Sequence, residues 1–201
     1  MRIIGGIYRS RKLRAAPGRS TRPTSDRVRE ALFSILDTAG AVAGACTLDL
    51  YAGTGALALE ALSRGAKSAL LVESSRATLP VLRANIRNLG LDQKAVVLAA
   101  DVEANASRLA DHGPFDLVFA DPPWKLVDDG TTSRVLAEVA RAGALSPGAL
   151  VILEHAARSS TPEIAGLSLT DARRYGDTAL AMYKPAILDP SRLGLARTTS
   201  E

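Results

Sequence analysis

The sequence has few of the residues on which several common protein classes depend. Its 201 residues include one cysteine, Cys46, and two histidines, His112 and His155, which are far apart in the chain. A single cysteine excludes an internal disulfide framework, and no His/Cys/Asp cluster has the spacing of metal ligands. Aromatic residues make up only 4% of the chain, so the core must be built from Ala, Leu and Val.

Long apolar runs are also missing. No stretch approaches the roughly 18 residues that a membrane span needs, and the N-terminus lacks the apolar stretch and cleavage site of a signal peptide. With 47% hydrophobic and 23% charged residues, the composition is that of a globular domain. We expect a soluble, cytoplasmic protein with a single core, and a monomer by default.

Positive charge is concentrated at the N-terminus. Residues 1–30 carry nine basic and two acidic side chains, a net charge of +7, whereas the other 171 residues have a net charge of −3. A basic segment favours a polyanionic partner such as nucleic acid, because binding releases counterions from phosphates; a solvated basic tail is the alternative. The candidate RNA-binding residues are Arg9, Arg11, Lys12, Arg14, Arg19, Arg22 and Arg27.

The chain begins with a strand or hairpin and a loop over its first 23 residues. Apolar residues at positions 28, 31, 32, 35 and 36 then predict one buried face of a helix over 26–37, with Arg27, Arg29 and Ser34 on other faces. We assign residues 1–40 to a small basic N-terminal extension.

Alternating strand and helix patterns follow. Short apolar runs predict strands at 47–51, 69–73, 95–100, 115–120 and 149–154, and helical patterns fall at 56–64, 76–88, 103–110 and 132–143. This alternation predicts an α/β fold with a parallel sheet covered on both faces. Residues 168–174 and 178–183 predict an antiparallel hairpin, so that one domain spans 41–185 and a loose tail spans 186–201.

The first predicted strand leads into a glycine-rich turn. Gly53, Gly55 and Ala58 fit the G-x-G-x-x-[GA] pattern of a nucleotide-type cofactor site at a strand-to-helix turn. A side chain at these glycines would keep the backbone away from the ligand. A tight turn without a ligand is the alternative.

Acidic residues lie in or directly after three of the predicted strands. Asp49 lies in the carboxyl-terminal half of the first, Glu73 ends the second and Asp101 directly follows the third. Glu73, 20 residues after Gly53, is where an acid accepts hydrogen bonds from both ribose hydroxyls, and Asp101 could accept from an adenine amino group. Neighbouring residues counted with the same site are Tyr51, Thr54 and Val102.

The fourth predicted strand is followed by Asp121-Pro122-Pro123-Trp124. Two prolines make the loop stiff. The Asp121 carboxylate and the Pro122 carbonyl can accept both hydrogens of an exocyclic amine while Trp124 stacks on its base. The lone pair of the amine then points at an electrophilic methyl group. A stiff turn with a packed tryptophan is the alternative.

Taken together, these residues resemble a known family. Residues 49–55 with 121–124 are similar to S-adenosylmethionine-dependent amino-methyltransferases of the [DN]-P-P-[FYW] type. More narrowly, residues 2–6, 11–13, 22–33 and 57–65 resemble the bacterial small-subunit rRNA guanine-N2 methyltransferases of the RsmD family. The resemblance runs from residue 2 to about residue 184.

The resemblance implies a seven-stranded Rossmann-like sheet that ends in a hairpin, and methyl transfer to guanine N2 of 16S rRNA in the small ribosomal subunit or an assembly intermediate. Asp49, Gly53 and Gly55 would hold the methionine end of the cofactor, and Asp121 to Trp124 would grip a flipped-out guanine. The segment with Thr24 and Arg27 would cover the methionine moiety or meet RNA. Two positions depart from the family pattern, namely Ser75 in place of a second acid and Trp124 in place of Phe or Tyr.

Three alternatives remain at this point. The Asp121 loop does not exclude adenine N6 of DNA or RNA as the target, although the basic N-terminus and the lack of a DNA target-recognition domain disfavour it. An NAD-dependent oxidoreductase would leave the Asp121 loop unexplained. A non-catalytic RNA-binding assembly factor would not need acids at four strand ends.

Overall fold

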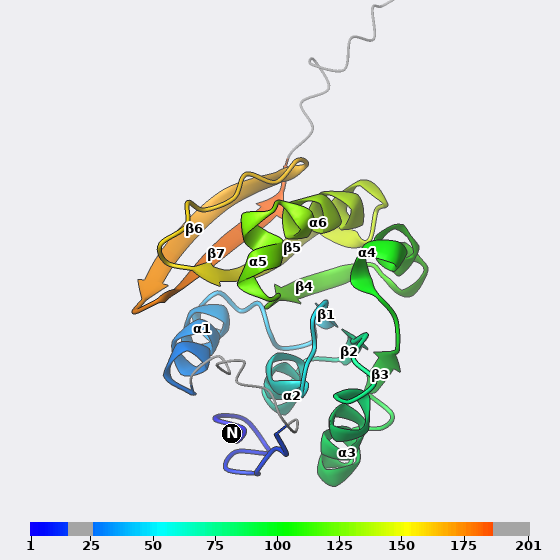
Figure 1. Cartoon of the computed structure of the whole chain (residues 1–201). Helices are drawn as coiled ribbons and strands as arrows, with labels where there is room; N and C mark the ends of the chain where they lie inside the picture. Colours follow the sequence, from blue (N-terminus) through cyan, green and yellow to red (C-terminus); the bar gives the residue numbers. More distant parts are fainter. Residues whose placement is uncertain (16–25, 187–201) are drawn as a thin grey trace, which may run out of the picture.

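The computed structural model describes residues 1–15 and 26–186, which form a seven-stranded sheet with helices on both faces (Figure 1). The strand order is β3-β2-β1-β4-β5-β7-β6. Five strands are parallel: β1 (Cys46–Asp49), β2 (Ser68–Val72), β3 (Ala95–Leu98), β4 (Phe115–Ala120) and β5 (Leu145–Ala156). The last two, β6 (Leu167–Tyr175) and β7 (Thr178–Pro185), are antiparallel, and β7 lies between β5 and β6.

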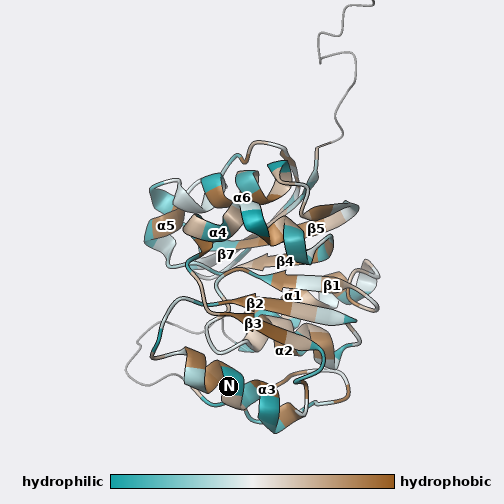
Figure 2. Cartoon of the chain, turned by 90° about the vertical axis from the view of Figure 1, so that its right-hand side faces the viewer, coloured by the Kyte–Doolittle hydropathy of each residue, from teal (hydrophilic) through white to brown (hydrophobic). Residues whose placement is uncertain are grey.

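The helices form two layers. One layer holds α1 (Asp26–Thr38), α2 (Ala56–Ser63) and α3 (Leu79–Leu89); the other holds α4 (Val102–Asn105), the 3₁₀ helix η1 (Ala106–His112), α5 (Trp124–Asp128) and α6 (Thr131–Arg141). Alternate residues of each strand face opposite layers, so Phe119 packs with the first layer and Val118 with the second. Figure 2 shows the hydrophobic residues concentrated on the strands and the hydrophilic ones on the surrounding helices.

The predicted fold class is confirmed, including the parallel strands and the antiparallel hairpin at the end of the sheet. Many element ends differ from the prediction by up to three residues, and three differences change an element itself. The helix predicted at 103–110 is split into α4 and η1, and Trp124, expected in the loop with the prolines, is the first residue of a short helix, α5, that was not predicted. Proline is well suited to a helix start, because its φ is already helical and it needs no amide donor there. Strand β5 begins early, at Leu145, because a register irregularity against β4 accommodates Pro147 and Gly148.

The buried face of α1 also differs from the prediction. Arg29 is fully buried, so its assignment to another face was wrong. Its Nη2 donates to the Arg2 carbonyl and to Asp26 Oδ1 at 3.0 Å, and its Nε lies 3.9 Å from Glu60 Oε2. Burial lowers the pKa of Arg29, and Glu60 and Asp26 oppose that shift. The hydrophobic pattern alone could not reveal these acidic partners.

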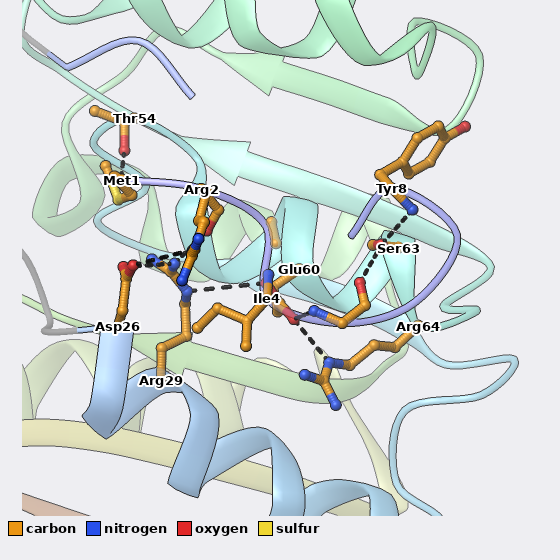
Figure 3. Close-up of polar contacts among 12 residues, drawn as sticks. Met1, Arg2, Ile4, Tyr8, Asp26, Arg29, Thr54, Glu60, Ser63 and Arg64 are labelled. Atoms are coloured by element: carbon orange, nitrogen blue, oxygen red, sulfur yellow. Dashed lines mark hydrogen bonds and ion pairs between the residues drawn. The ribbon is translucent and has the colours of Figure 1, made fainter. Parts of the chain in front are cut away.

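The N-terminal residues 1–15 pack against α2 rather than extending away from the sheet (Figure 3). Ile3 and Leu13 are buried in the same core cluster as Leu59 of α2. We call residues 1–15 the N-terminal arm. Within the described ranges, no helix has the length and apolarity that crossing a membrane requires.

Candidate active site

The carboxyl ends of β1, β2, β4 and β5 surround a cavity of about 670 Å³. That volume is within the range of small-ligand sites. Every predicted catalytic and cofactor-binding residue lines the cavity except Gly55. The sheet edge therefore collects in one place residues that are up to 75 positions apart in the chain (Asp49 to Trp124).

Asp49 is the most deeply buried acid of the site, with 1% of its surface exposed. Its Oδ2 accepts a hydrogen bond from the Ala58 amide at 3.3 Å, and its Oδ1 has no hydrogen-bond partner in the described part of the chain. Burial raises the pKa of Asp49 to about 7; the nearby charges of Asp121 and Glu73 add to the shift, and the Ala58 amide opposes it. A buried acid with an unpartnered oxygen is suited to a cationic ligand.

Glu73 holds the glycine-rich turn in place. Its Oε2 accepts from the Gly53 amide at 2.9 Å, and its Oε1 accepts from the Ser75 amide at 2.6 Å. Gly53 has a φ of +55°, a left-handed conformation that favours glycine. Ser75, where the family often has a second acid, thus contributes its backbone to fixing Glu73.

Gly55 lies outside the cavity lining and has a packing role instead. It precedes α2 with a φ of +83°. A Cβ at this position would lie 2.7 Å from Leu82 Cδ1 and 3.2 Å from Leu59 Cδ1. Glycine is therefore required here because α2 and α3 pack closely against the turn.

The remaining predicted cofactor residues line the cavity from two segments, the turn between β1 and α2 and the start of α4. Tyr51 is half-buried, and burial raises its pKa. The Thr54 carbonyl accepts from Asn85 Nδ2 of α3 at 2.9 Å. Asp101 caps α4 by accepting from the Ala104 amide at 3.1 Å, and the adjoining Val102 is buried.

The Asp121 loop joins β4 to α5 at the same edge. Asp121 is half-buried, Pro122 is buried and Pro123 directly precedes α5. Trp124 is the first residue of α5, and the Arg158 guanidinium lies 5.8 Å from the centre of its ring. The loop thus places a carboxylate, a proline carbonyl and an aromatic ring beside one another at the cavity wall.

Several lining residues were not predicted from the sequence. Glu154 ends the cavity-facing part of β5 and is 7% exposed, and Tyr175 and Thr178 come from the β6–β7 turn. Val28 and Arg29 contribute from α1. The rule that selected Asp49 and Glu73, an acid directly after an apolar strand run, would also have selected Glu154.

A buried acid of α2 anchors the N-terminal arm beside the cavity (Figure 3). Glu60 is fully buried and accepts from the amides of Ile4 and Gly5, each at 2.7 Å. It also accepts from Arg64 Nε at 2.8 Å. Ser63, one turn on, accepts from the Tyr8 amide at 3.0 Å.

The predicted RNA-binding residues of the described ranges all reach the surface. They are Arg9, Arg11, Lys12 and Arg14 of the arm and Arg27 of α1. Arg11 also donates from Nη2 to the Asn88 carbonyl of α3 at 2.9 Å. Arg19, Arg22 and Thr24 lie outside the described residues, as does the predicted tail from residue 187 onward.

The histidines take no part in a metal-binding group in the described ranges. His155 is 1% exposed, its Nδ1 is 3.0 Å from the Ala156 carbonyl, and burial lowers its pKa. Cys46 begins β1 and is partly exposed, less buried than expected for a core residue.

Comparison with known proteins places this architecture in one family. A family model described as "Conserved hypothetical protein 95" matches residues 1–184. Ribosomal RNA small subunit methyltransferase D of Escherichia coli K12 is 38% identical over 187 residues, covering 92% of this chain and 89% of the relative. The Bacillus subtilis protein YlbH is 33% identical over 187 residues, covering 92% and 98% respectively.

Solved structures agree with this assignment. The Escherichia coli protein yhhF superposes with a TM-score of 0.78 at 37% identity, covering 92% of this chain and 97% of that one. A hypothetical protein of Thermus thermophilus gives 0.77 at 32% identity, covering 90% and 98%. The chain therefore belongs to the family described as conserved hypothetical protein 95, the RsmD family that its sequence resembles.

Proposed function

We propose that this protein transfers a methyl group from S-adenosyl-L-methionine to the exocyclic N2 of a guanine in 16S rRNA. One observation carries the proposal: the glycine-rich turn, held by Glu73, and the Asp121 loop line the same cavity. The first suits a nucleoside cofactor and the second suits an exocyclic amine. The 38% identical relative named as an rRNA small subunit methyltransferase supports the substrate class.

The charge of the cavity lining suits S-adenosylmethionine. Asp49 Oδ1, buried and without a hydrogen-bond partner in the described part of the chain, would hold the methionine ammonium. Glu73 would accept from the ribose hydroxyls, and Asp101 from the adenine amine. When bound, the cofactor supplies an electrophilic methyl group on a sulfonium, and three carboxylates near a cation favour it electrostatically.

The protein's own contribution to the reaction is alignment of the amine. Asp121 and the Pro122 carbonyl accept the two N2 hydrogens, so the nitrogen lone pair points out of the base plane toward the cofactor. Trp124 stacks on the flipped base and fixes its plane. The methylated amine gives up one proton to Asp121 or to water. No strong general base is required, since most of the acceleration comes from positioning.

The N-terminal arm supplies the RNA-binding surface in this proposal. Its exposed Arg9, Arg11, Lys12 and Arg14 sit on a segment that Glu60 fixes beside the cavity. Arginine and lysine at such positions contact phosphates. Shape and flanking phosphates of the folded rRNA would then select the target nucleotide, in the small subunit or in a protein-bound assembly intermediate.

The test is tritium transfer from labelled S-adenosylmethionine into small subunits from cells that lack the gene, followed by nucleoside identification. Label in N2-methylguanosine is expected, and label in N6-methyladenosine or no label would refute the proposal. Asp121→Ala should lower kcat by about 100-fold or more while cofactor affinity is kept. Asp92→Ala, an exposed acid before β3 at the opposite edge of the sheet, is the matched control.

A further inference from the structure

We infer that Glu154 selects guanine over adenine by accepting a hydrogen bond from guanine N1–H. This inference rests on the proposed function and names the residue that reads the base. Glu154 lines the same cavity as Asp121 and is 7% exposed. The Asp121 loop recognises an exocyclic amine, which adenine also has, so a second residue must distinguish the two purines.

Strand register places Glu154 beside Asp121. Ala120 of β4 pairs with Leu153 of β5 in parallel, so the next residues, Asp121 at the end of β4 and Glu154 within β5, lie at the same level on adjacent strands. Neighbouring strands are about 4.8 Å apart. Side chains alternate along a strand, and Ile152 belongs to the core cluster that faces α1. Two positions further on, Glu154 faces the same side, where Val28 of α1 also lines the cavity.

On the side of β5 away from β4, the neighbouring strand is β7. Leu180 of β7 pairs with Glu154, and the β6–β7 turn brings Tyr175 and Thr178 to the cavity wall. Glu154 therefore lies between the Asp121 loop on one side and this turn on the other. A flipped base whose amine is held by Asp121 would present its adjoining ring edge to Glu154.

The ring atom beside the amine differs between the purines. In guanine, N1 carries a hydrogen next to the N2 amine, whereas in adenine, N1 is a bare acceptor next to the N6 amine. A carboxylate can accept from guanine N1–H but meets the adenine N1 lone pair with its own lone pairs. In a buried site the negative carboxylate of Glu154 repels the adenine N1 lone pair, and this repulsion disfavours the wrong base.

The experiment uses small subunits reconstituted with 16S rRNA that carries guanine or 2,6-diaminopurine at the methylated position. Diaminopurine keeps the N2 amine but has a bare acceptor at N1. The full-length enzyme should prefer guanine by about 100-fold in kcat/KM. Glu154→Gln, whose amide can donate to N1, should lose about 10- to 100-fold on guanine and narrow the preference at least tenfold.

Glu163→Gln is the matched control, because it removes an exposed carboxylate that follows β5 without lining the cavity. It should keep the wild-type preference. Glu154→Asp keeps the charge, but its carboxylate lies one methylene further from the base. It should therefore slow the methylation of guanine without speeding the methylation of diaminopurine. Cofactor binding and melting temperature of each variant show that it is folded.

The experiment distinguishes a failure of the proposed function from a failure of the proposed role of Glu154. A wild-type enzyme that forms no N2-methylguanosine would refute the proposed function. A wild-type enzyme that methylates guanine N2 but uses diaminopurine equally well would refute only the role of Glu154. An unchanged preference in a folded Glu154→Gln variant would do the same.

Discussion

Asp49 makes the cofactor-free protein less stable as the pH rises. Its pKa is about 7, against an ordinary value of 3.8, so between these values the native state keeps a proton that the unfolded chain has lost. Stability is therefore highest below the unfolded pKa and falls as the pH rises toward 7. The loss is at most about 1.4 kcal/mol per pH unit, and from pH 5 to pH 8 it amounts to about 3 kcal/mol in all.

The substitution Asp49→Asn removes this titration and keeps an acceptor for the Ala58 amide, which now donates to Asp49 Oδ2. Urea denaturation of both proteins at pH 5 and at pH 8 gives four free energies of unfolding. The advantage of the variant over the wild type should grow by about 3 kcal/mol between the two pH values, since other titrating groups cancel in the difference. A difference that changes by less than about 1 kcal/mol would refute the burial argument.

The same titration links proton release to cofactor binding. A cationic ligand favours ionised Asp49, so the wild-type affinity for S-adenosylmethionine should rise with pH up to about 7. Binding at pH 6 should release a proton, which calorimetry in buffers of different ionisation enthalpy measures. The affinity of Asp49→Asn should be lower and show no such pH dependence. Equal pH dependence in both proteins would assign the effect to another group.

Three further substitutions, two of them with a matched control, test the scaffold and the RNA-binding surface. Glu60→Ala should cost about 3–5 kcal/mol in chemical denaturation because it removes the buried carboxylate that faces Arg29 and leaves the Ile4 and Gly5 amides without their acceptor. Glu138→Ala, in an exposed pair, should cost under about 1 kcal/mol. Gly90→Ala should lower the free energy of unfolding by about 1 kcal/mol, because its φ is left-handed and no other atom is near. Gly55→Ala should cost about 1–3 kcal/mol more, because the added Cβ also crowds Leu82 of α3. Equal losses in the two variants would contradict the packing role of Gly55. Arg9→Gln should reduce the slope of log affinity for RNA against log salt by about one, and an unchanged slope would show that this residue does not contact phosphate.

Patterns that depend on neighbouring residues predicted the fold well. Apolar runs identified the five parallel strands, and the turn at residues 175–177 identified the hairpin of β6 and β7. The strand-end acids Asp49, Glu73 and Asp101 were expected at one edge because parallel strands end together. This prediction requires only that the strands be parallel, and it does not depend on their order in the sheet. It succeeded because the topology is regular over β1 to β5.

Features that depend on distant partners could not be predicted. Arg29 looked like a surface residue because its partners, Arg2 and Glu60, are 27 and 31 positions away. Gly55 fitted a cofactor motif, but the side chain that would collide with its Cβ belongs to Leu82 of α3. The local spacing indicated that glycine is required at this position, whether the reason is a cofactor or a packed side chain. Only tertiary packing identifies which neighbour imposes it.

The position of β7 determines when the sheet can be completed during synthesis of the chain. Residues 178–185 are translated after every other strand, yet they occupy an interior place between β5 and β6. Until they emerge from the ribosome, β5 presents an unpaired edge next to buried residues such as Ile152 and Leu153. Such an edge can pair with another chain. A nascent chain stalled before residue 178 will therefore be aggregation-prone, and it will lack the turn that completes the cavity.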